Sequence, residues 1–148
     1  MEDKQLSTII QDYKNVHQIP EEGFKEFKTH KYIKEELGKL DCLIFELKPT
    51  GIIAFFNFHH TSTIAFRCEL DGLPIDETTN LEYKSIHQGY MHACGHDGHM
   101  AILLEFARRI KNIKCKRNIC LIFQPSEEKY GGANFIIQSP EFQSLNII

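Results

Sequence analysis

The segment MHACGHDGHMAILLEFARRI, residues 91–110, joins a group of potential metal ligands to an amphipathic pattern. Its first ten residues contain three histidines, a cysteine and an aspartate. The following apolar residues recur at helical spacing, with arginines in the last turn: Met100, Leu103, Leu104, Ala107 and Ile110. The pattern predicts a helix that starts near His99. The polar group therefore lies at a strand-to-helix junction, where α/β proteins place ligand sites.

Strand and helix patterns surround this segment. Runs rich in β-branched and aromatic residues predict strands within 42–48, 51–58 and 61–70, and the apolar run 118–125 predicts a buried strand. His59 and His60 link the second run to the third, which predicts a hairpin of these two strands with both histidines exposed. Helical spacing also predicts helices over 6–16, most of 24–40, and 133–138. Together the elements indicate an α/β fold with a mixed sheet flanked by helices.

The composition is that of a single globular domain. Of the 148 residues, 42% are hydrophobic and 25% are charged, with a formal net charge of −3, which argues against disorder. Scattered basic residues give no nucleic-acid footprint and favour a small-molecule substrate. We expect a cytoplasmic protein without a membrane span, because the start lacks a signal-peptide pattern and no run approaches about 18 apolar residues. The five cysteines favour reduced thiols, with Cys42 and Cys120 in the core.

The polar group at 92–97 has the residue types of a metal site. In an extended segment, side chains two positions apart share a face, so His92, Cys94 and His96 would point to the same side. Thiolate and neutral imidazole bind zinc and similar divalent metals, and Asp97 could orient a ligating imidazole. The alternative reading is a set of polar residues that fix the junction by hydrogen bonds.

Two pairs of carboxylates follow predicted strands. Glu127 and Glu128 come after the buried strand, where one carboxylate can bind a metal while the other accepts a proton from water. Glu69 and Asp71 alternate at the end of another strand and so share a face. Each pair also has an explanation that involves no catalytic site. Glu127 and Glu128 could lie at a helix N-terminus, which favours carboxylates, and Glu69 and Asp71 could keep an edge strand soluble.

Four segments together resemble a known family. These are HQIPEEGFKEFKT (17–29), RCELDGLPIDE (67–77), MHACGHDGHMA (91–101), and FQPSEE with GGA (123–133). Their order and spacing are similar to those of the aminoacylase and carboxypeptidase-like, metal-dependent amidohydrolases, in the branch with hippurate hydrolase, N-acetyldiaminopimelate deacetylase and the auxin-conjugate hydrolases. The resemblance implies that the chain is the N-terminal portion of a zinc-peptidase-like catalytic domain.

The resemblance implies roles for the matching residues. Cys94, His96 and Glu128 match ligands of a two-metal site, which would hold zinc, manganese, cobalt or nickel. Glu127 matches the general base that activates the attacking water. Asp71 matches a carboxylate that supports the metal site from behind.

Four other residues are expected to support this site without binding metal. His92, Asp97 and His99 belong to the motif itself. Glu69 is a departure, because the branch usually has aspartate at this position.

The resemblance implies a metal-dependent hydrolase that cleaves the amide bond of N-acyl amino acids or related small conjugates. Such relatives are much longer, are expected to be homo-oligomeric, and carry further histidine ligands and a dimerisation or lid domain. Residues 1–148 are therefore expected to be a partial catalytic domain, inactive by itself. One alternative is a non-catalytic fragment that binds a metal or a partner. Another is a hydrolase with Cys94 as nucleophile, which would survive chelation and be inactivated by alkylation.

Overall fold

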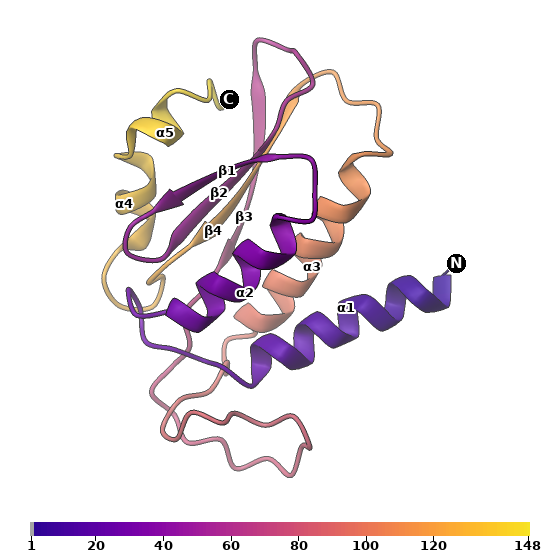
Figure 1. Ribbon diagram of the computed structural model, residues 1–148. Coiled ribbons are helices and arrows are strands. Elements are labelled where there is room, and N and C mark those ends of the chain that lie inside the picture. The colour runs from indigo at the N-terminus through magenta and orange to yellow at the C-terminus, as the bar shows by residue number, and fades with distance from the viewer. Residues whose placement is uncertain (1) are drawn as a thin grey trace.

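A computed structural model describes the backbone of residues 2–148 and the side chains of residues 6–148 (Figure 1). The helices and strands follow one another as α1 (Glu2–His17), α2 (Phe27–Leu37), β1 (Leu43–Leu47), β2 (Gly51–Phe56), β3 (Thr63–Glu69), α3 (His96–Ile110), β4 (Asn118–Gln124), α4 (Gly132–Ile137) and α5 (Pro140–Gln143). The predicted fold class, a mixed sheet flanked by helices, is confirmed. No helix within residues 2–148 is long and apolar enough to cross a membrane.

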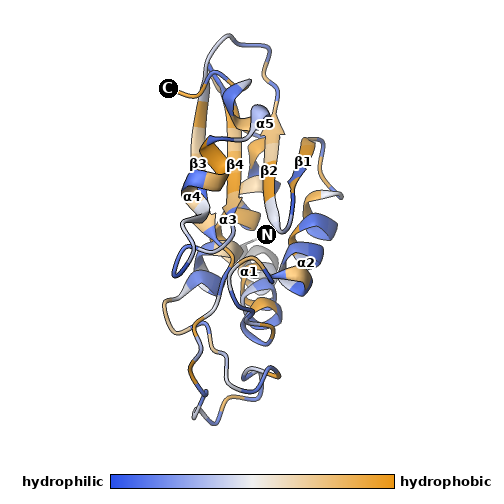
Figure 2. Cartoon of the chain, turned by 90° about the vertical axis from the view of Figure 1, so that its left-hand side faces the viewer, coloured by the Kyte–Doolittle hydropathy of each residue, from blue (hydrophilic) through white to orange (hydrophobic). Residues whose placement is uncertain are grey.

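The four-stranded sheet has the order β1-β2-β4-β3 (Figure 2). β2 is antiparallel to both β1 and β4, whereas β3 is parallel to β4. The prediction of a hairpin between β2 and β3 is therefore wrong. The turn at residues 48–50 joins β1 to β2, and β4 lies between β2 and β3. All seven residues of β4 are buried, as suits a central strand with a partner on each side. The link residues His59 and His60 are exposed, as predicted.

Helices cover both faces of the sheet and explain the unbroken apolar runs. Along β4, Ile119 and Leu121 point into the core below α1, α2 and α3, while Cys120 and Ile122 point into a second core below α4 and α5. Figure 1 shows the two groups of helices on opposite sides of the strands. All five cysteines are free, but Cys42 is only partly buried, at the margin of the first core rather than inside it.

One edge of the sheet gathers the ends of the elements that carry the polar motifs. β3 and β4 are parallel, so their carboxyl ends lie at the same edge, and α3 begins there as well (Figure 1). α3 starts at His96, earlier than the pattern predicted, after Gly95 with φ 80°. This left-handed conformation favours glycine, and it turns the chain sharply into the helix.

Candidate metal centre

His96, the first residue of α3, lies at the centre of the polar group and is 5% exposed. Its Nδ1 is 2.8 Å from the main-chain oxygen of Asp71, just beyond β3. A carbonyl oxygen only accepts hydrogen bonds, so Nδ1 carries a proton. In the neutral ring the lone pair is therefore on Nε2, which is the form that binds a metal. Burial alone would lower the pKa of His96, but the contacts with Asp71 raise it to about 8.

Glu127 and Glu128 lie in the loop after β4, and this loop is fixed from below. The buried Ser126 donates its backbone N–H to Glu26 Oε1 at 2.8 Å, and Glu26 is fully buried at the start of α2. The second oxygen of Glu26 accepts a hydrogen bond from the Thr50 hydroxyl in the turn before β2. Glu26 therefore joins three segments beneath the two neighbouring glutamates.

The carboxylates of Glu127 and Glu128 face the free nitrogen of His96. Nε2 lies 3.9 Å from Glu127 Oε2 and 3.8 Å from Glu128 Oε1. One ligand atom from each of the three residues lies within 4.8 Å of the others. Two ligands held at about 2.0–2.2 Å from one zinc ion are at most about 4.4 Å apart, so both measured pairs fit a shared ion.

Cys94, another predicted ligand, is exposed, and among the described side chains the group of ligand atoms within 4.8 Å consists of His96, Glu127 and Glu128 without it. A hydrogen bond to Glu128 and the surrounding carboxylates raise the pKa of its thiol to about 11. Without a cation the thiolate is thus strongly disfavoured, which argues against Cys94 as a nucleophile activated by histidine. A divalent cation would reverse the local electrostatics and favour a thiolate ligand.

Asp71 lies behind His96 and is 1% exposed. Its Oδ2 accepts the backbone N–H of Glu128 at 3.0 Å. Burial tends to raise its pKa, but the neighbouring His96 imidazole and hydrogen bonds from backbone N–H groups lower the pKa below the ordinary value. Oδ1 lies 3.5 Å from His96 Nδ1 and has no hydrogen-bond partner in the described part of the chain. A buried ionised carboxylate behind an imidazole is the arrangement that orients metal-binding histidines, so these residues fit a cation at Nε2.

His92 does not share a face with Cys94 and His96, so the prediction from alternation is wrong. Residues 93 and 94 form a turn, with the N–H of Gly95 donating to the oxygen of His92 at 3.2 Å. His92 is buried, and neither ring nitrogen has a hydrogen-bond partner among residues 6–148. Burial lowers its pKa to about 4, so the ring is neutral.

Asp97 contacts the imidazole of His17, a residue not predicted to belong to the site. Its Oδ2 lies 2.6 Å from Nδ1 of His17, at the end of α1, and His17 Nε2 lies 3.2 Å from Glu77 Oε1. All three side chains are buried. His17 belongs to the first of the four family-like segments, which is the one signal that could have indicated it.

Glu69 and His99 form a separate pair at the edge of the group. His99 Nδ1 lies 2.9 Å from Glu69 Oε2, and Arg67 Nη2 lies 2.8 Å from Glu69 Oε1. The Glu69 side chain is 10% exposed and the His99 side chain 55% exposed. Glu69 and His99, which were both predicted to support the metal site, therefore contact each other directly.

Residues 65–147, more than half of the chain, match the family model of peptidase family M20/M25/M40. The chain belongs to this family. Among curated relatives, it is 43% identical over 142 residues to the N-acetyldiaminopimelate deacetylase of Oceanobacillus iheyensis, covering 94% of this chain and 38% of that protein. It is 41% identical over 140 residues to the deacetylase of the same name from Listeria innocua, covering 93% and 38%. The chain thus spans about two fifths of the length of these relatives.

Solved structures agree with membership of the M20 family. A putative aminohydrolase from methicillin-resistant Staphylococcus aureus is 35% identical with a TM-score of 0.86, over 93% of this chain and 36% of that one. A Bacillus subtilis protein described as a dinuclear metal binding peptidase from the M20 family is 33% identical with a TM-score of 0.85, over 97% and 41%. The similarity to this peptidase supports divalent metals as the cofactor of the M20 site.

Proposed function

We propose that this chain forms the metal-binding part of a hydrolase that cleaves the amide bond of N-acyl amino acids. The observation that carries the proposal is the convergence of His96 Nε2 with the carboxylates of Glu127 and Glu128, within 4.8 Å of one another. Similarity to the two deacetylases supports an acetylated amino acid, with N-acetyldiaminopimelate as the specific candidate.

In this proposal each residue has a defined task. Cys94, His96 and Glu128 would hold a divalent cation such as zinc, manganese, cobalt or nickel, which supplies Lewis-acid polarisation of the acyl carbonyl and acidifies water. Glu127, whose side chain is 42% exposed, accepts the proton of the attacking water and passes it to the leaving amine nitrogen. The main-chain oxygen of Asp71 keeps the proton of His96 on Nδ1, so that the lone pair of Nε2 is available to the cation.

The number of ligands limits what residues 1–148 can do by themselves. Three protein ligands and water complete one catalytic zinc site, whereas a two-metal site needs more. We therefore assign the chain to a partial catalytic domain, with the further ligands of a second ion lying outside it.

The test uses a hybrid in which this chain replaces the matching residues of the Oceanobacillus iheyensis deacetylase. We expect the hybrid to release acetate from N-acetyl amino acids, to stop when a chelator is added, and to recover with added divalent metal. A folded, metal-loaded hybrid without hydrolysis would contradict the proposal. Activity that survives chelation but not alkylation of Cys94 would favour the cysteine mechanism instead.

A further inference from the structure

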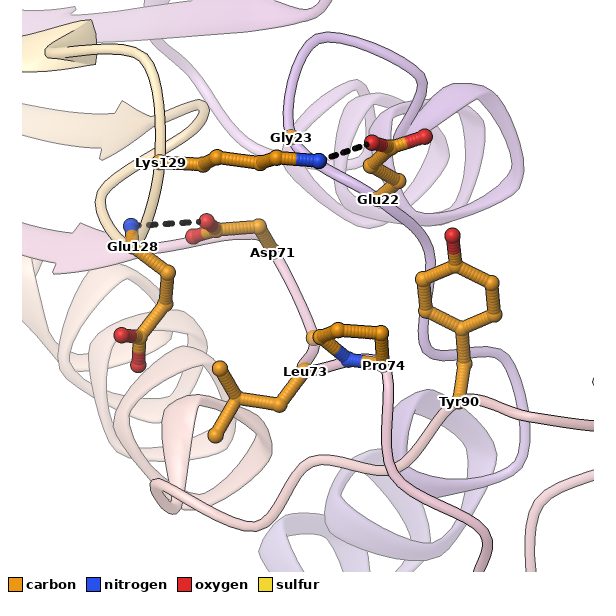
Figure 3. A pocket seen from close by; sticks show the side chains of 9 residues that line it. Glu22, Gly23, Asp71, Leu73, Pro74, Tyr90, Glu128 and Lys129 are labelled. Carbon is orange, nitrogen blue, oxygen red and sulfur yellow. Dashed lines mark hydrogen bonds and ion pairs between the residues drawn. The ribbon is translucent and has the colours of Figure 1, made fainter.

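A pocket of about 220 Å³ lies against the candidate metal centre (Figure 3). Asp71 and Glu128 line this pocket and also belong to the centre, so a molecule held near Glu128 can extend into it. Pockets that enclose a whole drug-sized ligand have about 300–1,000 Å³. This smaller pocket is suited to one end of a substrate.

The walls of the pocket differ in chemistry. Leu73 and Pro74 form an apolar side, while Glu22 and Lys129 form a charged side (Figure 3). Tyr90 stands across the pocket from Glu128, with its hydroxyl directed toward Glu22. A ligand that fits all three surfaces has a short apolar stem and an end with both charges.

The charged pair is held in place but keeps free hydrogen-bonding capacity. Glu22 Oε1 lies 2.9 Å from Lys129 Nζ and 3.2 Å from the Tyr130 hydroxyl, and Glu22 Oε2 lies 2.7 Å from Lys25 Nζ. A carboxylate offers about four acceptor sites and an ammonium has several donors. Glu22 and Lys129 can therefore each bind one more partner without separating.

We propose that this pocket, the Glu22–Lys129 pocket, binds the free amino-acid end of an N-acyl diamino acid. The substrate ammonium donates to Glu22, and the substrate carboxylate accepts from Lys129 and from the Tyr90 hydroxyl. The methylene chain between the two ends packs on Leu73 and Pro74. The inference rests on the proposed function, because the acyl amide must lie at the metal centre for its other end to reach this pocket.

The consequence is selection at the end of the substrate remote from the acyl group. An N-acyl amino acid with an uncharged side chain leaves Glu22 and Lys129 bound only to each other and to their neighbours. A side chain that ends in a carboxylate alone engages Lys129 but not Glu22.

The test is a nuclear magnetic resonance titration of the isotope-labelled chain with three probes. N-acetyldiaminopimelate has both distal charges, N-acetyl-α-aminopimelate lacks the distal ammonium, and N-acetylnorleucine lacks both charges. Exposed charge pairs contribute little, so we expect affinity to fall about fivefold for each charge removed. The amide signals of residues 90 and 129 should shift with the first probe.

Two variants and a matched control locate the effect. Glu22→Gln should abolish the preference for the first probe over the second, and Lys129→Met the preference for the second over the third. Lys25→Met is the control, because Lys25 contacts Glu22 without lining this pocket, and it should keep the order of affinities. Equal affinity for all three probes would overturn the pocket assignment and leave the proposed function standing. No binding of any probe would also overturn the pocket assignment, whereas the proposed function is decided by hydrolysis in the hybrid.

Discussion

The buried link between His17, Asp97 and Glu77 predicts a large loss of stability when the imidazole is removed. In the variant His17→Leu, an apolar side chain fills the space between two buried carboxylates. Asp97 loses its contact of 2.6 Å and Glu77 its contact of 3.2 Å. The link joins the end of α1 to the start of α3 and to the long loop between β3 and α3, so all three segments lose a common anchor.

The magnitude follows from what each carboxylate keeps. Removing one partner of a buried ion pair destabilises a protein by about 3–5 kcal/mol. Asp97 still accepts the N–H of Gly98 at 2.8 Å, and Glu77 still accepts the N–H of Ser85 at 2.6 Å, so the lower end applies. We expect a loss of about 3 kcal/mol in the free energy of unfolding, out of about 5–15 kcal/mol for a typical domain. With a slope of about 2 kcal/mol per molar urea, the unfolding midpoint falls by about 1.5 M.

The assay is urea unfolding followed by circular dichroism at several pH values. Burial by itself lowers the pKa of His17, but the hydrogen bonds to Asp97 and Glu77 raise it above its ordinary value. The stabilisation is therefore complete below about pH 6.5 and is lost as pH rises through the pKa of the folded state. The exposed His60 provides the control, since His60→Leu should change stability by less than about 0.5 kcal/mol. A midpoint shift below about 0.3 M for His17→Leu, or a shift independent of pH, would refute the reasoning.

Three further predictions concern the metal centre and its support. Glu127→Gln should keep metal and lose about 10²–10⁴-fold in turnover in the hybrid, whereas Glu128→Gln should weaken metal binding measured by calorimetry; the reverse pattern would exchange the two roles. The isolated chain should bind at most one divalent ion, weakly, and hydrolyse N-acyl amino acids only at a trace rate, so two tightly bound ions or robust turnover would disprove the ligand count. Glu26→Gln should destabilise the fold by about 1–3 kcal/mol in urea unfolding, because an amide has one oxygen to accept from both Ser126 N–H and the Thr50 hydroxyl. Burial raises the pKa of Glu26, so wild-type stability relative to this variant should fall as pH rises above about 4.5, and a constant difference would argue against the buried carboxylate.

Strand positions were predictable from local pattern, but strand neighbours were not. The apolar run of β4 indicates a strand covered on both faces, and the structure buries every one of its residues. Nothing within that run says which strands flank it. β4 pairs with β3 only after the chain has passed through α3, which separates the two strands in the sequence. The short link at residues 59–60 gives no information about this pairing.

The same limit applies to the candidate site. The residue types at the ends of β3 and β4 were visible in the sequence, and the parallel pairing of these strands brings them to one edge. His17 and Glu26 were not selected, because their partners lie 80 and 100 residues away, at Asp97 and Ser126. Alternation was misleading for His92, since side chains share a face only in an extended segment and this one turns.

Because His96 Nδ1 contacts the main-chain oxygen of Asp71, the tautomer of His96 and the negative charge behind it can be changed independently. A side-chain acceptor can be deleted by a single codon change, but the acceptor here is present whatever residue occupies position 71. Asp71→Asn would remove the negative charge while the carbonyl still selects the same tautomer of His96. The backbone thus determines which nitrogen of this imidazole carries the proton, and substitutions at position 71 can change the charge behind the ring without changing the tautomer.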